Sequence, residues 1–452
     1  MRGFVFGLLF LISIMSVSAS QLCVIVYYPD ETADGRCINV NEGADGKEVL
    51  EKTGFDLLWT PDSMFGQMLC KINGIGTNVA GSVCHYDGEF WNFVLKDGDK
   101  WGHSPVGLNG GNECWNRDFS FSDWDKIVHY CAKDNDLIGF AFGAAGASPD
   151  MLKIKEVTIR VDGKKSSADK AGGTIKEVYP QSKIQVEVKL KNLYPKDTNI
   201  GIQNIKVQGV MEGINDGNDL DDESGDINLD AEEDDTATLN FNIPLEVKDD
   251  SYDFILTISG KDEKGIGYKK ELKYNLKLQK EKYDLKFLKT EISPESVKCS
   301  GTVILDLSLA NIGTKNEDVK LTVLNSDLGL NIEENFTLDK DPFGDGSKFR
   351  KQYELHVNNV KEGSYPIVIK ADNGNKNIEE TVNLAVTKCQ SNTKEDVGIT
   401  VVRKPTVATQ EKPSVNKTPR LMNNYGSLIL LSGILFVCLI VFIITAILIF
   451  RK

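Results

Sequence analysis

Alternating apolar and polar residues dominate the chain between positions 151 and 390. The alternation has a period of two and is clearest at 184–190, 252–258, 303–309 and 365–369. Successive side chains of a β-strand point to opposite faces of a sheet, so this pattern is typical of antiparallel strands with one buried face. The region is therefore predicted to consist of β-sheets, and the whole chain to be mainly β.

The same region contains an internal repeat. "VEVKLKNLYPKDTNI" at 186–200 parallels "LDLSLANIGTKNEDV" at 305–319, because each has an apolar strand, then an Asn and then a turn. "VKDDSYDFILTISGKDE" at 247–263 parallels "VKEGSYPIVIKADNGN" at 360–375. A repeat of this kind indicates two copies of one structural unit. The two β-sandwich domains that we expect lie at 151–280 and 281–390.

The first part of the chain is instead rich in Cys, Trp and Gly. Short β-rich runs surround one short helical pattern, so the expected order is strand, strand, helix and then further strands. The expected strands are at 24–28, 37–40, 64–72, 90–95 and 137–142, and the helix is at 46–53. We therefore expect a small α+β domain at 21–145. A run rich in Gly and Ala at 143–149 resembles a linker.

Two apolar segments lie near the ends of the chain. Residues 1–19 combine an early Arg, a short apolar run and small residues before a cleavage site, which is typical of a signal peptide. Residues 428–450 carry no charge, and these 23 residues are long enough as a helix to cross a bilayer. The basic pair at 451–452 favours the inside. We expect a single-pass cell-surface protein with its N-terminus outside, in which the Pro- and Thr-containing segment 391–427 is a stalk.

Acidity is concentrated in one segment. The net charge of −14 already disfavours nucleic acid as a partner. Residues 211–235 hold 12 Asp and Glu and no Lys or Arg. Two interpretations stand for this insertion, a solvated loop or a calcium site, although the spacing does not fit an EF-hand loop. The calcium candidates are Asp219, Asp221, Asp222 and Asp226. No other cofactor is expected.

Eight cysteines lie in the region expected outside the cell, where an even count suggests disulfides. In the first domain, proximity favours the pairs Cys23–Cys37, Cys70–Cys84 and Cys114–Cys131, although six cysteines allow many other pairings. Cys299 and Cys389 bracket the second sandwich, and each is the only remaining partner for the other. Zinc is the alternative, but no CxxC or HxxxH spacing occurs.

Two Asn-x-Thr sequons occur, at Asn335 and Asn416. Such sequons are acceptors for N-linked glycans on exposed segments of secreted proteins. Both are therefore predicted glycosylation sites, provided that the host has the required enzymes.

Sequence motifs for catalysis are missing. The chain has no GxSxG, HExxH, Walker or paired CxxC motif, and only four His. The Gly-rich stretch "CKINGIGTN" at 70–78 could suggest a phosphate loop, but no helix pattern and no third glycine follow at the required spacing. We expect a tight turn at this place and a protein that is not an enzyme.

The first domain resembles the transcobalamin-like C-terminal domain. The matching residues are the turn Ile72-Asn73-Gly74, the strand at 90–93, Gly107 and the closing strand at 134–142, within a helix-to-strand order that spans about 45–143. The resemblance implies a β-grasp-like fold that binds a soluble ligand or a partner. Extra cysteines and a long insertion at 109–130 depart from the family pattern.

Aromatic residues of this domain are the predicted contact surface, because aromatic rings offer a large contact area with a polar group. The candidates are Trp91, Trp101 and Trp115, together with Asn73 of the matched turn. The alternative for each Trp is packing in the core. The two repeats, in turn, resemble CARDB-type or S-layer-associated Ig-like domains of archaeal surface proteins, through "NIG" at 311–313 and "GSY" at 363–365.

The sequence is compatible with two functions. The first is a surface protein that presents a module for a soluble small ligand, a surface protein or a glycan on two Ig-like spacers. The second is a structural or adhesive envelope protein without a small-molecule ligand. An aromatic-lined concave pocket would favour the first, and a large exposed apolar patch would favour the second.

Overall fold

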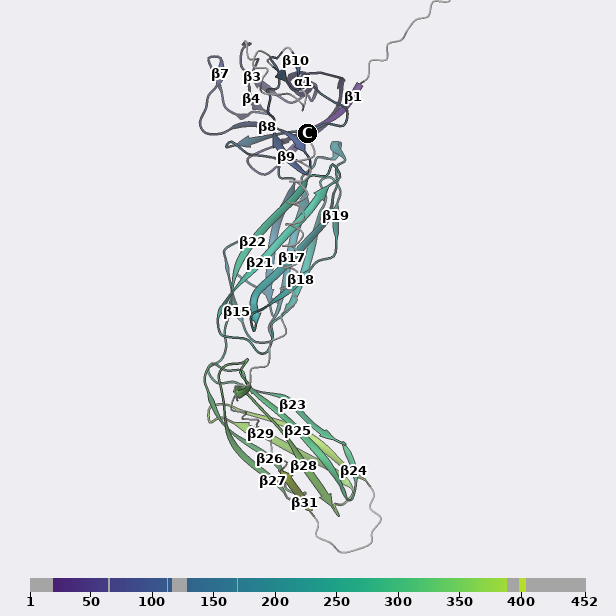
Figure 1. The fold of residues 1–452 in the computed structure, drawn as a ribbon, viewed down its shortest axis with the longest axis vertical. Helices are drawn as coiled ribbons and strands as arrows, with labels where there is room; N and C mark the ends of the chain where they lie inside the picture. The colour runs from purple at the N-terminus through teal and green to yellow at the C-terminus, as the bar shows by residue number, and fades with distance from the viewer. Residues whose placement is uncertain are drawn as a thin grey trace, which may run out of the picture. The chain divides into compact units, whose positions relative to one another are not determined.

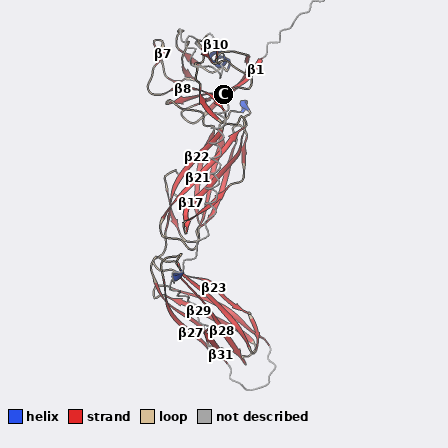
Figure 2. Ribbon diagram, viewed as in Figure 1, coloured by secondary structure: helices blue, strands red, loops and turns tan. Residues whose placement is uncertain are grey.

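The computed structural model describes residues 19–63, 66–111, 113–115, 128–168, 170–387 and 398–403. β-Strands dominate this part of the chain, and helix is confined to one α-helix and two short 3₁₀ turns (Figure 2). The predicted signal peptide up to residue 18, the predicted membrane helix at 428–450, Cys389 and the sequon Asn416 lie outside the described residues. Within the described part, no helix has the length and hydrophobicity that a membrane crossing requires.

The N-terminal domain is built on one mixed five-stranded sheet (Figure 1). Its first strand pairs in parallel with its closing strand, and every other neighbour is antiparallel. The order across the sheet is β2 (Ala33–Asn41), β1 (Ala19–Tyr27), β12 (Leu137–Gly143), β8 (Phe90–Asp97) and β9 (Lys100–His103). The predicted order of elements is therefore present.

A short helix, α1 (Gly46–Lys52), contributes Val49 and Leu50 to the core of this domain. Asp45 caps the helix, since its carboxylate accepts a hydrogen bond from the backbone N–H of Glu48 at 2.8 Å. Small sheets complete the domain. They are β3 (Leu57–Trp59) with β4 (Leu69–Ile72) and β5 (Ile75–Gly76), β6 (Val79–Ala80) with β7 (Val83–Cys84), and β10 (Glu113–Cys114) with β11 (Val128–His129).

The stretch that resembled a phosphate loop is a β-hairpin between β4 and β5. Ile72 pairs with Ile75, so only Asn73 and Gly74 form the loop, and both have positive φ angles. This geometry matches the two-residue turn that Asn-Gly favours. The hairpin brings Cys70 to the disulfide with Cys84.

Two sheets form the unit that we call the first sandwich. Its apolar strand faces pack into one cluster of buried residues. One sheet has the order β14 (Lys164–Lys165), β13 (Leu152–Val161), β16 (Lys183–Asn192) and β20 (Asp234–Asn242). The other has the order β15 (Thr174–Val178), β22 (Gly267–Leu278), β21 (Ser251–Asp262), β17 (Ile202–Asn215) and β18 (Asn218–Glu223), with β19 (Ile227–Leu229) also paired to β17, and the 3₁₀ turn η1 (Lys196–Thr198) follows β16.

The second sandwich has its own buried cluster. One sheet has the order β23 (Leu285–Ser293), β25 (Gly301–Asn311), β28 (Lys348–Asn358) and β31 (Gly398–Arg403). The other has the order β24 (Ser296–Lys298), β30 (Asn377–Thr387), β29 (Gly363–Asp372), β26 (Glu317–Asn325) and β27 (Leu330–Leu338), and the 3₁₀ turn η2 (Asp345–Ser347) precedes β28.

The two sandwiches share one topology. The orders β13-β16-β20 and β23-β25-β28 correspond strand by strand, as do β15-β22-β21-β17 and β24-β30-β29-β26. Each sandwich also has one short parallel strand at a sheet edge, β15 on β22 and β24 on β30. The repeated sequences fall on corresponding strands, β16 with β25 and β21 with β29.

Two segments differ from the sequence expectations. The acidic stretch 211–235 is largely strand, because β17 and β18 pair as a hairpin and β19 also pairs with β17. The predicted stalk at 391–427 includes β31, which extends the sheet of the second sandwich next to β28. The reason is local, since "GITVVR" at 398–403 is rich in β-branched residues, which favour strands.

The N-terminal domain and the first sandwich share a hydrophobic cluster. Cys23, Ile25 and Leu137 of the first domain belong to the same buried cluster as Met151 and Leu152. The backbone N–H of Gly267 also donates to the carbonyl oxygen of Asp99 at 2.7 Å. The linker-like run at 143–149 is therefore followed closely by Met151 and Leu152, which are packed in this shared cluster.

Candidate functional site

The candidate site is a pocket of about 600 Å³ in the N-terminal domain. This volume lies within the range of about 300–1,000 Å³ that is typical of small-molecule sites. Four parts of the chain form its walls: β4 with the residues before it, the β6–β7 hairpin and its exit, the start of β8, and the segment 106–109 after β9. The five-stranded sheet also contributes Phe93 on β8 and Phe140 on β12 to the lining.

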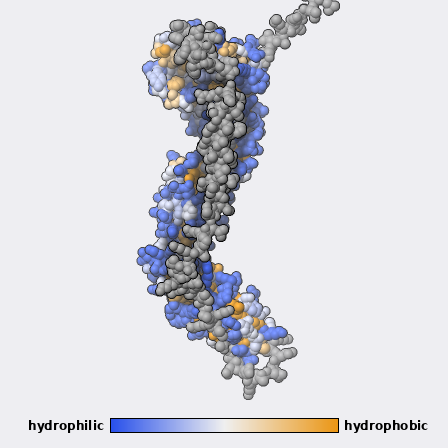
Figure 3. All heavy atoms as spheres, in the orientation of Figure 1, coloured by the Kyte–Doolittle hydropathy of each residue, from blue (hydrophilic) through white to orange (hydrophobic). Residues whose placement is uncertain are grey.

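Apolar and aromatic side chains dominate the lining. Trp91 and Phe140 are buried, whereas Phe90 and Tyr86 are 37% and 70% exposed. The exposed rings lie beside each other, with centroids 6.2 Å apart. The exposed apolar side chains that line the pocket are Met68, Val83, Tyr86 and Phe90. In the space-filling view, hydrophobic surface interrupts the hydrophilic surface of this domain (Figure 3).

Trp91 is the residue that connects the pocket to the core. Its indole N–H donates to the carbonyl oxygen of Ile75 at 3.1 Å, and its ring packs edge-to-face on Tyr28 and Phe142. The side chain is only 8% exposed. These contacts fix its orientation, so Trp91 forms a rigid wall of the pocket.

The β4–β5 hairpin is held against Trp91 by a glycine. Gly76 has a φ of +126°, and a Cβ at this position would overlap the carbonyl oxygen of Cys70 and lie 2.9 Å from Nε1 of Trp91. Only glycine combines this backbone conformation with such a close approach. The Cys70–Cys84 disulfide then ties β4 to β7, which are both pocket walls.

All three disulfide pairs favoured by proximity in the first domain are confirmed: Cys23–Cys37, Cys70–Cys84 and Cys114–Cys131. Cys299 is not paired with any cysteine that the structure describes. Its predicted partner Cys389 lies outside the described residues, so that pair stays a prediction.

Of the four predicted contact residues, only Trp91 lines the pocket. Trp101 is half-buried and packs against the cluster shared with the first sandwich, and a Cβ on Gly139 would lie 3.0 Å from its ring. Trp115 is half-buried next to the Cys114–Cys131 disulfide, and its backbone N–H donates to the carbonyl oxygen of His129 at 2.8 Å. The structure therefore does not bring the three Trp residues together in the pocket.

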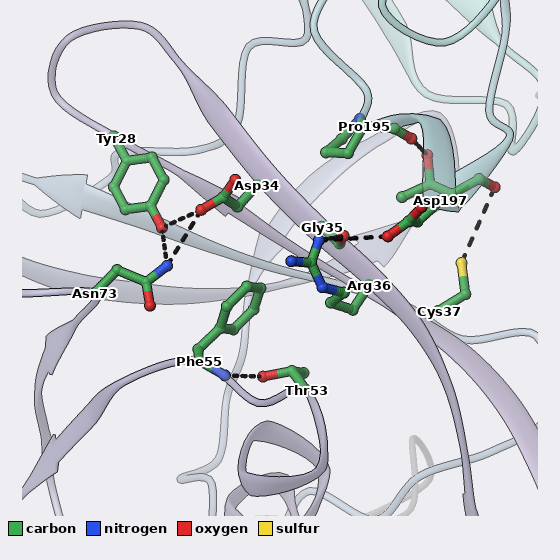
Figure 4. A network of polar contacts seen from close by, with 11 residues as sticks. Tyr28, Asp34, Gly35, Arg36, Cys37, Thr53, Phe55, Asn73, Pro195 and Asp197 are labelled. Carbon is green, nitrogen blue, oxygen red and sulfur yellow. Dashed lines mark hydrogen bonds and ion pairs between the residues drawn. The ribbon is translucent and has the colours of Figure 1, made fainter.

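Asn73 belongs to a polar network that holds the hairpin (Figure 4). Its Nδ2 donates to the Tyr28 hydroxyl at 2.8 Å and to the Asp34 carboxylate at 3.2 Å, and its Oδ1 accepts from the N–H of Asp56 at 3.0 Å. The Tyr28 hydroxyl donates to Asp34 at 2.9 Å. Burial and this bond to Asp34 raise the pKa of Tyr28 well above its usual value. In this structure the amide of Asn73 is engaged within the protein.

The four calcium candidates do not converge. Among the described residues, no group of three carboxylates gathers its oxygens closely enough for one ion. Alternation along β18 sends neighbouring side chains to opposite faces. The carboxylate of Asp219 accepts from the N–H of Gly213 at 2.8 Å, and that of Asp222 accepts from the N–H of Asn240 at 2.7 Å. Asp226 lies 3.8 Å from the ammonium group of Lys206.

A different group brings three metal-binding residue types together. The side chains of Cys114, His129 and Cys131 lie within 4.8 Å of one another. Both cysteines form a disulfide, so neither offers the thiolate that a metal requires. The group is therefore a disulfide with an adjacent imidazole, and His129 Nε2 lies 3.5 Å from Sγ of Cys131.

Comparisons with known proteins provide no family for this chain. No protein-family model matches it, and no curated protein sequence is similar to it. A red sea bream transglutaminase structure is 9% identical, with a TM-score of 0.18, over 52% of this chain and 32% of that one. CBD12 from CALX1.2 is 10% identical, with a TM-score of 0.18, over 41% of this chain and 74% of that one. A chimeric titin Z1Z2 tandem is 16% identical, with a TM-score of 0.17, over 48% and 95%.

These similarities are too low to support an argument about function. The chain spans about a third of the transglutaminase chain.

Proposed function

We propose that this chain is a membrane-anchored extracellular protein whose N-terminal domain binds a soluble ligand or partner in the pocket beside Trp91. The two sandwiches serve as Ig-like spacers, the segment at 428–450 as the anchor, and Asn335 as an exposed glycan acceptor on β27. The observation that carries the proposal is an apolar pocket of about 600 Å³ whose wall strands are joined by the Cys70–Cys84 disulfide. Disulfides support an oxidising, extracellular location.

The topology of the N-terminal domain supports the β-grasp-like assignment. In a fold of this kind, a first hairpin and a parallel closing strand form one mixed sheet, and a helix follows the hairpin. Here β1 and β2 form the hairpin, α1 follows, and β12 pairs in parallel with β1. The resemblance to transcobalamin-like domains rests on the same region. The resemblance motivates a binding role, whereas the residues that line the pocket indicate the class of ligand.

Two matched variants test the binding role. Phe90 and Leu58 are both 37% exposed in this domain, but only Phe90 lines the pocket. The full chain is incubated with a metabolite extract and analysed by native mass spectrometry. We expect a non-covalent adduct that Phe90→Asp removes and Leu58→Asp retains, because a charge in an apolar pocket is costly. No adduct from a folded protein, or equal adducts in both variants, would contradict the proposal.

A second candidate function is adhesion to a neighbouring surface protein. The exposed rim of Met68, Val83 and Tyr86 favours it, since clustered exposed apolar residues mark interaction surfaces. Surface cross-linking on intact cells separates the two functions. Adhesion predicts one defined cross-linked neighbour that is lost in Phe90→Asp but not in Leu58→Asp, without any small-molecule adduct.

A further inference from the structure

Among the residues that the structure describes, one buried polar group in the lining of the pocket has no partner. Asn109 lines the pocket, and its side-chain Nδ2 is buried and makes no hydrogen bond to any described residue. Buried donors without a partner are rare in proteins, because removing them from water is costly. A ligand oxygen would satisfy this donor.

The orientation of the Asn109 amide is fixed by its other atom. Oδ1 accepts a hydrogen bond from the backbone N–H of Gln67 at 2.8 Å. Exchanging the two amide atoms would place an N–H against that N–H, so the donor must be on the other side of the group. Gly66 allows Asn109 to come close to the backbone before Gln67. A Cβ on Gly66 would overlap Oδ1 of Asn109 and lie 2.7 Å from the backbone carbonyl oxygen of Asn109.

Charges around the pocket restrict what kind of oxygen fits. Among the described lining residues, none is Lys or Arg, and the side chains that can carry a charge near neutral pH are Glu89 and His85, which are both exposed. A carboxylate ligand would meet Glu89 without a permanent cation to offset its charge. A neutral carbonyl oxygen accepts from an amide N–H without this cost.

We propose that the pocket selects a small neutral molecule with a ring-containing apolar body and a carbonyl oxygen, and that Nδ2 of Asn109 donates to that oxygen. This proposal rests on the proposed binding function and names the ligand class of the same site. The Nδ2 atom is covered in this structure, so the proposal includes a side-chain movement on binding that exposes this donor to the pocket.

Three naphthalene probes test the proposal on the full chain. Prodan carries a neutral ketone, 2-dimethylamino-6-propylnaphthalene has a methylene in place of the carbonyl, and 6-dimethylamino-2-naphthoate carries a charge. Affinities are measured by probe fluorescence for the wild type, Asn109→Ala and Asn109→Asp at pH 8. Any partitioning of a probe into detergent or into other apolar segments of the chain is the same for all three proteins. It therefore cancels when the affinities of the wild type and the variants are compared.

We expect Asn109→Ala to weaken Prodan by about five- to tenfold, which corresponds to one hydrogen bond to a buried amide. Asn109→Asp keeps the acceptor for Gln67 but loses the donor, so it should weaken Prodan at least as much. The propyl analogue should bind all three proteins alike, which shows that the pocket is intact. The naphthoate should bind the wild type more weakly than Prodan does.

Three other outcomes would contradict the proposal in different ways. If Prodan and its propyl analogue bind and both are insensitive to Asn109, the pocket binds apolar molecules but the carbonyl contact is refuted, and water must satisfy the amide. If the naphthoate binds more tightly than Prodan, the neutral ligand class is wrong. If no probe binds the wild type although the thermal unfolding profile is normal, both the ligand class and the binding function lose their support.

Discussion

Asn192 and Asn311 hold equivalent turns in the two sandwiches. Both are buried at the end of corresponding strands, β16 and β25. The side chain of Asn192 donates to the carbonyls of Ile200 and Leu229 at 2.9 and 3.1 Å, and its Oδ1 accepts from the N–H two residues later at 2.9 Å. Asn311 donates to the carbonyls of Lys315 and Leu338 at 2.7 and 3.3 Å, and it accepts from the N–H two residues later at 2.8 Å.

Asn311→Ala should destabilise the second sandwich by about 1–3 kcal/mol, because it removes the side-chain hydrogen bonds to two carbonyls and to one N–H. Asn192→Ala should do the same in the first sandwich. Hydrogen exchange followed by peptide mass spectrometry reports each sandwich separately. Asn375→Ala, at an exposed turn, is the control and should change stability by less than about 0.5 kcal/mol. Equal loss of protection in both sandwiches after one substitution would contradict the assignment.

The repeat was predictable because its signals are local. An apolar strand, an Asn and a turn occur together in 186–200 and again in 305–319, and the side chain of each Asn bonds within that turn. The disulfides of the first domain were predictable for the same reason, since each joins cysteines 14 or 17 residues apart. Short separations make proximity along the chain a useful guide.

The pocket was not predictable in the same way. Its lining comes from five segments between residues 67 and 140, and no single segment has a binding pattern. The sequence singled out Trp residues by type, yet Trp101 packs in a shared core and only Trp91 lines the pocket. Asn109 had no signal at all, because its role depends on the backbone of Gln67, which lies far away in sequence. Tertiary contacts decide which aromatic residues face a cavity.

Two glycines of the β4–β5 hairpin should respond differently to substitution. Gly74 has a φ of +79° with open space around it, whereas a Cβ on Gly76 would overlap the carbonyl oxygen of Cys70. Gly74→Ala should therefore cost only about 1–2 kcal/mol for its backbone conformation. Gly76→Ala should cost about 1–3 kcal/mol more, because it also displaces Trp91 or the disulfide strand. Thermal unfolding followed by Trp fluorescence tests this, and equal shifts in the two variants would refute the role of Gly76.

The register of the second sandwich supports the predicted Cys299–Cys389 disulfide. Lys298 on β24 is paired in parallel with Thr387 on β30, so Cys299 directly follows the last paired residue. Non-reducing peptide mapping of the full chain should recover a linked peptide that contains Cys299 and Cys389. Ser at both positions should then destabilise this sandwich by about 2–5 kcal/mol. Labelling of Cys299 by iodoacetamide before reduction would contradict the pair.

A pH dependence is expected from Glu317, which is buried in the second sandwich. Burial raises the pKa of this carboxyl above its usual value, and bonds from the Asn373 side chain and the Asp284 backbone N–H, the latter at 2.8 Å, partly oppose the rise. A group with a raised pKa in the folded state contributes stability that is fully present below its unfolded-state pKa. That contribution is lost as the pH rises through the folded-state pKa.

The free energy of unfolding of the wild type, relative to that of Glu317→Gln, should therefore fall as the pH increases from about 4 towards 7. Calorimetry measures this difference, with the transition of the second sandwich identified by its response to Asn311→Ala. Asn373→Ala is the matched variant. It removes a bond that lowers the pKa of Glu317, so the loss of stability should extend to higher pH. A difference that increases with pH would mean that bonds to the ionised carboxylate outweigh its burial.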